Sequence, residues 1–177
     1  MTHSEIFEIF DANNQLIGQA PRDQVHAEGL FHRSVHVLLF NSQNEILLQR
    51  RAANKDICPN LWDLSAAEHL KPGETTHQAA LRGLEEELGI PQDAAPNLTL
   101  TRAFRLQRLD DPALGIRDYE FVETYTTTWD GPLIMDTVEL ADMSFWSKEK
   151  LQTTMQKEPG LFTPWFQNEM AFLGFQD

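Results

Sequence analysis

The chain has 177 residues, 41% of them hydrophobic, and a formal net charge of −13. This length and apolar content allow a substantial buried core, so we expect one globular domain spanning residues 1–177. The acidic balance argues against large nucleic acids as partners, because a strongly negative surface repels a polyanion.

The first residues and the cysteine content indicate the cellular compartment in which the protein is expected. The first residues lack a basic segment followed by an apolar run, so we expect no secretory signal. No stretch approaches the roughly 18 uninterrupted apolar residues of a membrane helix. Cys58 is the one cysteine, which rules out an internal disulfide and fits a reducing compartment. We therefore predict a soluble, cytoplasmic protein with no membrane partner. The oligomeric state stays open, with a homodimer among the options.

The first third of the chain reads as strands. Residues 5–19 carry two apolar runs around a turn-rich tetrapeptide and predict an N-terminal hairpin. Residues 21–29, broken by proline and glycine, are a loop or a short helix. The apolar runs 32–41 and 46–51 flank an Asn/Ser-rich turn and predict a central hairpin. Residues 61–67 are expected to form a third strand.

Local signals then predict a helix over residues 76–88. Pro72 and Gly73 form a turn dipeptide. Thr75, followed three residues later by Gln78, has the form of a capping box at the start of the helix. Gly89 is expected to end the helix.

The remainder alternates between strands and helices. Asp, Pro and Gly in residues 108–116 predict a long loop with room to lie over a site. The other expected elements are strands at 98–106, 119–129 and 145–146, and helices at 148–156 and 163–173, the last with Thr163 as its N-cap and Pro164 at its first position. This order predicts an α/β (α+β) fold with a mixed β-sheet sandwiched between α-helices.

Three consecutive carboxylates, Glu85, Glu86 and Glu87, lie near the end of the predicted helix. At helical spacing Leu84 and Leu88 fall on the core face, and Glu86 and Glu87 fall away from it. Crowded carboxylates repel one another unless a cation neutralises them, and Mg²⁺ or Mn²⁺ takes oxygen ligands while leaving positions open for substrate phosphates. The alternative is an ordinary solvated face.

Residues 68–90 resemble the Nudix box. That pattern is Gly, five residues, Glu, seven residues, Arg-Glu, an aliphatic residue, any residue, Glu-Glu, any residue, Gly and an aliphatic residue. The matching positions are Glu74, Arg82, Leu84, Glu86, Glu87, Gly89 and Ile90, and the two departures are Glu68 in place of the first Gly and Gly83 in place of the Glu after Arg.

The resemblance implies a Nudix fold in which Glu86 and Glu87 hold Mg²⁺ or Mn²⁺, with Arg82 and Glu74 orienting them. In much of that family the Glu replaced here by Gly83 is a metal ligand and sometimes the general base. Its absence leaves the number of metal ions and the identity of the base open.

Further segments look like the Nudix branch that includes type I isopentenyl diphosphate isomerases and related hydrolases. They are residues 28–36, 47–51, 59–63 and 162–165. In those isomerases, the positions of His32, His69, Asp118 and Glu120 hold the catalytic divalent metal, with Asp118 where a Glu would be expected. The essential isomerase cysteine falls at Ala67, which can neither donate nor accept a proton.

The resemblance therefore favours a hydrolase. Among candidate bases we rank Glu120 first, then Glu87, with Glu85 and Glu68 behind. Arg50 and Arg51, at the end of a predicted central strand, could contact substrate phosphates bidentately.

We thus predict a Mg²⁺- or Mn²⁺-dependent pyrophosphohydrolase that cleaves a small organic diphosphate by water attack. Two alternatives remain, an isomerase of allylic diphosphates and a Nudix-fold binding module with weak or no catalysis. The predicted catalytic residues are Glu86, Glu87, Glu120 and Arg82, the metal ligands are Glu86, Glu87, Glu120 and His69, and His36 is expected to be structural.

Overall fold

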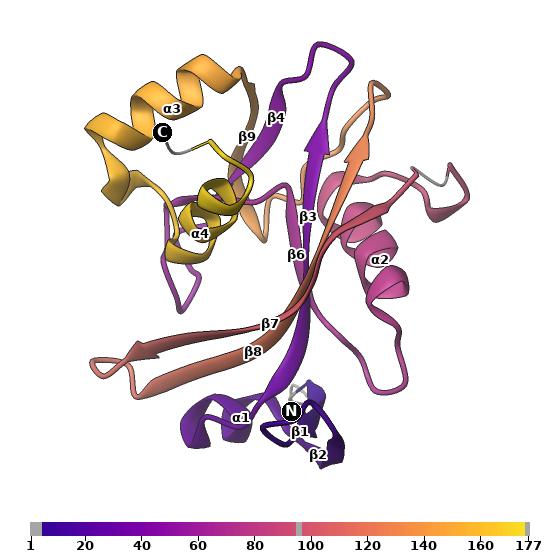
Figure 1. Cartoon of the computed structure of the whole chain (residues 1–177), viewed down its shortest axis with the longest axis vertical. Helices are drawn as coiled ribbons and strands as arrows, with labels where there is room; N and C mark the ends of the chain where they lie inside the picture. The colour runs from indigo at the N-terminus through magenta and orange to yellow at the C-terminus, as the bar shows by residue number, and fades with distance from the viewer. Residues whose placement is uncertain (1–4, 95–96, 176–177) are drawn as a thin grey trace. The chain divides into compact units, whose positions relative to one another are not determined.

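The computed structural model describes residues 5–94 and 97–175 and is a mixed α and β structure, as predicted. A two-stranded sheet pairs β1 with β2, and a seven-stranded sheet has the order β5-β4-β3-β8-β7, with β6 paired to β3 and β9 paired to β4 (Figure 1). The strands are β1 Ile6–Phe10, β2 Leu16–Pro21, β3 His32–Phe40, β4 Ile46–Arg51, β5 Trp62–Asp63, β6 Ala66–His69, β7 Thr99–Asp111, β8 Ile116–Thr128 and β9 Leu140–Trp146. The helices are α1 Arg22–Glu28, α2 Thr76–Leu88, α3 Lys148–Lys157 and α4 Pro164–Phe172, with short 3-10 turns at Gln92–Ala94 and Pro159–Leu161.

The chain divides into two compact units, which we describe separately. The first unit comprises the chain up to His36 together with Ala67–Ala80 and Leu100–Tyr125. The second comprises Val37–Ala66, Leu81–Thr99 and the chain from Thr126 onward. The single domain expected from the sequence stays a prediction.

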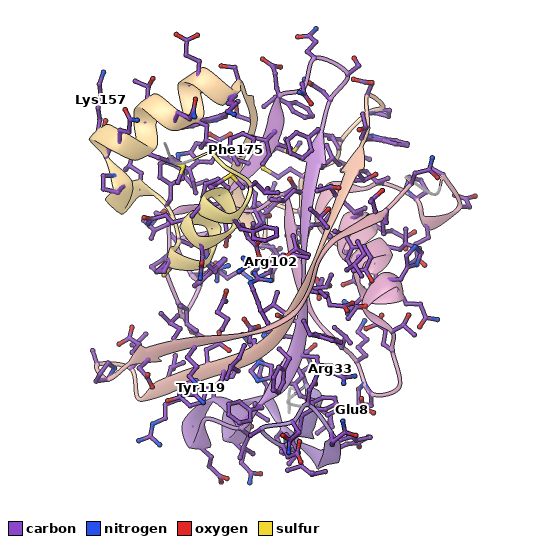
Figure 2. All side chains as sticks on the ribbon, viewed as in Figure 1. Glu8, Arg33, Arg102, Tyr119, Lys157 and Phe175 are labelled. Carbon is purple, nitrogen blue, oxygen red and sulfur yellow. The ribbon has the colours of Figure 1, made fainter. Side chains whose placement is uncertain are left out.

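In the first unit, the N-terminal hairpin forms as predicted. The segment that the sequence left as a loop or a short helix forms helix α1. Val25 of α1 is buried together with Phe7 of β1 and Ala20 of β2. Arg33, labelled in Figure 2, lies 4.0 Å above the ring of Phe10 and donates from Nε to Asn14 Oδ1 at 2.9 Å. The hairpin is thereby fixed to the start of β3.

The predicted long loop at residues 108–116 is wrong. β7 continues to Asp111 and β8 begins at Ile116, so only residues 112–115 turn the chain. Asp111 Oδ1 accepts from the Ala113 amide at 3.0 Å, and the Tyr119 hydroxyl donates to Asp110 Oδ1 at 2.8 Å (Figure 2 labels Tyr119). The polar residues that suggested a loop instead close the tip of a two-stranded ribbon.

In the second unit, β4 pairs with β9 over the full length of β4. The strand expected at 61–67 is instead divided into β5 and β6. Between them, the Ser65 hydroxyl accepts from the Leu39 amide and donates to the Leu47 carbonyl, both at 2.7 Å. The Ser65 amide also donates to the Val37 carbonyl at 3.1 Å, so the side chain and the backbone of Ser65 together hold the chain where the strand is interrupted.

Helix α2 has the predicted bounds. The Thr75 amide donates to Gln78 Oε1 at 2.9 Å, as expected of a capping box. Gly89 follows the helix with φ of 66°, a backbone conformation that favours glycine, and a Cβ there would lie 2.7 Å from the side chain of Ile134. One expectation is corrected, because Glu87 is buried although it was placed away from the core face, and Arg82 is buried as well.

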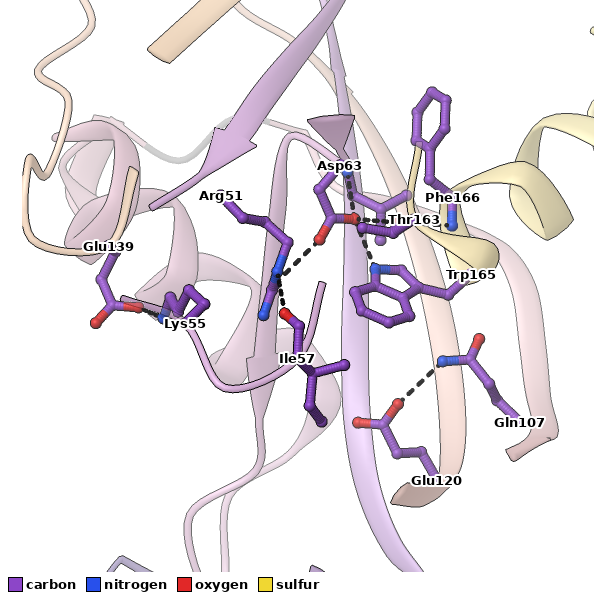
Figure 3. A network of polar contacts seen from close by, with 11 residues as sticks. Arg51, Lys55, Ile57, Asp63, Gln107, Glu120, Glu139, Thr163, Trp165 and Phe166 are labelled. Atoms are coloured by element: carbon purple, nitrogen blue, oxygen red, sulfur yellow. Dashed lines mark hydrogen bonds and ion pairs between the residues drawn. The ribbon is translucent and has the colours of Figure 1, made fainter. Parts of the chain in front are cut away.

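Helix α4 begins at a buried carboxylate. Thr163 is its N-cap, as predicted, and accepts from the Phe166 amide. Asp63 Oδ1 accepts from Thr163 Oγ1 at 3.0 Å and from Trp165 Nε1 at 2.6 Å, and Asp63 Oδ2 pairs with Arg51 Nη1 at 3.1 Å (Figure 3). One side chain thus joins the end of β4 to the C-terminal helix.

Replacing Asp63 with alanine is expected to lower the free energy of unfolding by about 3–5 kcal/mol, because a buried ion pair loses one partner and two buried donors lose their acceptor. Urea denaturation measures the change. The exposed Asp56, in the same unit, is the matched control, and Asp56→Ala should stay within about 0.5 kcal/mol of the parent. Equal effects of the two substitutions would show that Asp63 does not hold this junction.

Candidate metal centre

Four side chains from four elements of the first unit converge on one point. His26 lies on α1, His32 begins β3, His69 ends β6 and Asp118 lies near the start of β8. One ligand atom from each lies within 4.8 Å of every other. We call these four residues, together with Glu120, the His–carboxylate cluster.

Three ligand atoms of the cluster, from His26, His32 and Asp118, lie close to one another. Asp118 Oδ1 lies 3.4 Å from His32 Nε2 and 3.7 Å from His26 Nε2. All three atoms are buried, and none has a hydrogen-bond partner within residues 5–94 and 97–175. Buried polar atoms left unpaired cost free energy. Three such atoms facing one another fit a bound divalent cation.

Glu120 completes the cluster from β8. Its Oε1 lies 3.2 Å from His69 Nε2 and 3.8 Å from His32 Nε2. Its Oε2 instead accepts from Gln107 Nε2 of β7 at 3.1 Å, as Figure 3 shows. One carboxylate oxygen therefore faces the imidazoles, and the other is turned toward Gln107.

The imidazole of His32 is oriented from behind. Its Nδ1 lies 3.1 Å from the carbonyl of Leu30, which can only accept, so Nδ1 carries the proton and Nε2 presents its lone pair. The ring of Phe7 stacks on His32 with centroids 5.2 Å apart and approaches His69 at 4.6 Å. The buried Phe7 ring thus packs against both imidazoles on this side of the cluster.

Burial and mutual charge shift the pKa values. Burial alone would raise the pKa of Glu120, but the His69 hydrogen bond and the nearby imidazoles hold it well below its usual range. Burial lowers the pKa of His26 to about 4, despite the neighbouring Asp118. Burial would also lower the pKa of His69, but Glu120 and Asp118 outweigh it and raise that pKa above 6.5. His26 is thus neutral near pH 7, whereas His69 retains its proton more readily.

Affinity for a divalent cation is expected to rise with pH through the neutral range. A histidine must lose its proton to bind a metal ion, and the pKa of His69 is raised, so protons compete until the pH exceeds that pKa. Titration calorimetry with Mn²⁺ in two buffers of different ionisation enthalpy, between about pH 6 and pH 8.5, should show proton release that declines as the pH rises. Binding without proton release at any pH would contradict this assignment.

The donor set bears on which ion fits. Three imidazoles with two carboxylates suit Zn²⁺, a borderline ion, and Mn²⁺, which accepts nitrogen ligands beside oxygen, better than Mg²⁺, which prefers an all-oxygen shell.

Of the predicted metal ligands, the structure brings His69 and Glu120 together in the cluster. His26 was not predicted, because it lies in a short segment without a clear pattern. The one available signal was the i, i+4 spacing of Arg22 and His26, which places both residues on one face of a helix.

The predicted residues of the Nudix box lie mainly in the second unit. Arg82 Nη1 donates to Glu86 Oε2 at 3.2 Å, and the side chain of Glu86 is 50% exposed. Glu87 is only 7% exposed. Glu74, in the first unit, accepts from the Lys71 amide at 2.9 Å and closes the turn before α2.

The two arginines predicted to bind substrate have different surroundings. Arg51 is engaged by Asp63, and its Nε donates to the Ile57 carbonyl at 3.1 Å (Figure 3). Arg50 lies opposite Trp62 and Asp142 in the sheet, and among the described residues its buried Nε has no hydrogen-bond partner. Arg51 thus has a structural role that the sequence did not reveal.

Comparison with known proteins identifies the family to which this fold belongs. The model of the NUDIX domain matches residues 30–166. An isopentenyl-diphosphate Delta-isomerase of Pectobacterium atrosepticum is 34% identical, over 92% of this chain and 88% of that protein. An uncharacterized Nudix hydrolase of Listeria monocytogenes is 36% identical, over 92% and 90%. The chain belongs to the Nudix family and, as predicted, is an enzyme of the Nudix hydrolase class.

Solved structures confirm the predicted fold. DR0079 from Deinococcus radiodurans superposes with a TM-score of 0.65 at 23% identity, covering 87% of this chain and 90% of its own. The MutT protein from Methanosarcina mazei gives a TM-score of 0.62 at 20% identity, covering 82% and 92%. Within the described part of the chain, no helix has the length and apolar character needed to cross a membrane.

Proposed function

We propose that this chain is a divalent-metal-dependent pyrophosphohydrolase that cleaves the diphosphate linkage of a small organic metabolite by attack of water, in a reducing cytoplasmic compartment. The observation that carries the proposal is the His–carboxylate cluster, in which the buried ligand atoms of His26, His32 and Asp118 face one another without hydrogen-bond partners among the described residues. Hydrolysis of a diphosphate needs this combination of charge neutralisation and an oriented water.

The residues of the cluster have two proposed roles, metal binding and proton acceptance. A divalent ion bound there would neutralise charge on phosphate oxygens and acidify a water. His26, His32 and Asp118 are suited to hold it because their ligand atoms are buried and close together. Glu120 is the candidate to accept a proton from the attacking water, since its carboxylate is ionised and its Oε1 lies beside the imidazoles of His69 and His32.

Arg22 is the best candidate in the first unit to contact a substrate phosphate. It lies one helical turn before His26 on α1, and its charge lowers the pKa of both His26 and His69. Its buried Nε has no hydrogen-bond partner among the described residues. A guanidinium beside a metal centre can bind a phosphate bidentately.

Isomerisation is the second candidate, favoured by the 34% identity to a protein named as an isopentenyl-diphosphate isomerase. Moving a double bond requires a proton donor and an acceptor on opposite sides of the substrate. Ala67 lies on β6, on the same side of the strand as His69, and its methyl group can serve as neither. Hydrolysis, which requires one base and a water, is therefore the better match.

Phosphate release from a panel of organic diphosphates, with Mn²⁺ and with Mg²⁺, tests the proposal. We expect metal-dependent turnover, and a fall of roughly a hundredfold in Glu86→Gln and in Glu87→Gln, because each substitution removes a carboxylate that the resemblance to the Nudix box assigns as a metal ligand. Glu85→Gln is the matched control, since Glu85 is exposed on the same turn and accepts from Gln92. A moved double bond without phosphate release would indicate the isomerase, and metal-dependent binding without product would indicate a binding module.

A further inference from the structure

A cavity of about 450 Å³ lies in the second unit, at the ends of three neighbouring strands. It is lined by Phe40 at the end of β3, Asn44 in the turn that follows, Asn97 and Thr99 around the start of β7, and residues 126–128, all threonine, at the end of β8. Small-molecule sites have volumes of roughly 300–1,000 Å³, so this cavity is large enough to hold an organic ligand. It shares no residue with the His–carboxylate cluster.

The described residues that line this cavity carry no charge, although 23% of the residues in the chain are charged. Apart from Phe40, every one of them is an asparagine or a threonine. A threonine hydroxyl and an asparagine amide each donate and accept hydrogen bonds. Such a lining has no counter-ion for a phosphate or an ammonium group. It suits a neutral ligand with many groups that also donate and accept.

One hydroxyl group of the lining is buried and unpaired. Thr127 is 5% exposed, and its Oγ1 has no hydrogen-bond partner in the part of the chain that the structure describes. An unpaired buried hydroxyl costs free energy. Because Thr127 borders the cavity, a ligand hydroxyl at this wall can supply the missing partner.

The turn that carries Asn44 is held in place before any ligand binds. The Trp129 amide donates to the Phe40 carbonyl at 2.8 Å, and the Ser42 amide donates to Asp130 Oδ1 at 2.8 Å. Both bonds join this turn and the end of β3 to the residues that follow β8. Asn44 has a φ of 62° and is exposed, so its amide is accessible to a ligand from a fixed backbone position.

We propose that this cavity is a binding site for an uncharged, polyhydroxylated ligand of the size of a monosaccharide or disaccharide. The hydroxyl groups of a sugar donate and accept as the threonines and asparagines of the lining do. Phe40 offers an apolar surface to the C–H groups of the sugar ring. This inference does not depend on the proposed function, because the cavity and the metal cluster have no residue in common.

The test measures binding of neutral sugars to the full chain without added metal. The probes are D-glucose, D-ribose, maltose and myo-inositol, and glucose 6-phosphate and adenosine serve as the charged and the nucleobase comparison. We expect calorimetry to give a Kd of roughly 0.1–10 mM for at least one neutral probe, and binding at least about tenfold weaker for both comparison ligands.

Asn44→Gly tests the mouth of the cavity. Glycine removes the amide and adopts the same left-handed backbone without strain, so sugar affinity should fall about tenfold while the fold is retained. Asn60→Gly is the matched control. Asn60 is an exposed asparagine of the same unit with a φ of 63°, and it does not line the cavity. Its replacement should leave sugar affinity unchanged.

Thr127→Val tests the buried hydroxyl. Valine has nearly the same shape, and removal of an unpaired hydroxyl should leave the melting temperature unchanged or raise it, whereas sugar affinity should fall about tenfold. A purely structural Thr127 would give the reverse, a lower melting temperature with unchanged affinity. Thr153→Val makes the same change at an exposed position of α3 in this unit and should alter neither quantity.

Three results would overturn the proposal. They are failure of every neutral probe to bind at about 50 mM, tighter binding of glucose 6-phosphate or adenosine than of any sugar, and sugar binding that neither Asn44→Gly nor Thr127→Val weakens. If Thr127→Val does not fold, Asn44→Gly beside Asn60→Gly decides the question.

Discussion

Replacing His32 with alanine is expected to weaken Mn²⁺ binding by at least about a hundredfold and to abolish measurable turnover. His32 is fully buried, and its Nε2 lies 3.4 Å from Asp118 and 3.8 Å from Glu120. Alanine would remove a ligand and leave the buried carboxylates without the imidazole between them. Calorimetry measures the loss of metal affinity, and phosphate release measures the loss of turnover.

His77→Ala is the control for this experiment. His77 is an exposed histidine of α2 in the same unit, outside the cluster, and its ring lies 6.1 Å from that of Tyr125. Metal affinity and turnover should both stay within about twofold of the parent. If His32→Ala bound Mn²⁺ as tightly as His77→Ala, the cluster could not be the metal centre.

Features encoded by neighbouring residues were predictable from the sequence. Helix α2 was predicted with its observed bounds because Thr75, Gln78 and Gly89 specify its ends within a few residues of chain. The hairpin of β1 and β2 followed from apolar runs on either side of a turn. Residues 108–116 misled the prediction, because Asp, Pro and Gly occur at the tip of a long ribbon as readily as in a loop.

The candidate site could be predicted only in part, because its residues are distant in the chain. His26, His32, His69 and Asp118 meet through the pairing of separate strands and one short helix, and no periodicity links them. The resemblance to the isomerase branch pointed to His32, His69, Asp118 and Glu120, because a family pattern carries three-dimensional information that a single sequence lacks. His26 was missed because it lies outside every recognised motif.

Contacts between distant residues also explain why Arg51 was predicted to bind substrate. A sequence shows a cation at the end of a strand but not the buried carboxylate that binds it. Asp63, which accepts from Thr163 and Trp165 as well, lies far from both of them in the chain. Whether an arginine contacts substrate or structure depends on such distant partners.

Glu120→Gln is expected to reduce turnover by about 10²–10⁴-fold, because an amide cannot accept a proton from the attacking water. The substitution conserves volume, and the new amide can still offer an oxygen to Gln107. Metal affinity should therefore fall less than turnover, by roughly 10–100-fold. Steady-state kinetics at saturating Mn²⁺ separates the two effects.

Glu123→Gln is the matched control on the same strand. Glu123 points to the opposite face of β8, where it lies 3.3 Å from the Tyr125 hydroxyl, which donates to it. Turnover in this variant should remain close to that of the parent. Retention of more than about a tenth of the parent turnover by Glu120→Gln at saturating metal would assign the base elsewhere. Glu87 is then the next candidate, because it combines burial with a place in the Nudix box, whereas Glu85 is exposed.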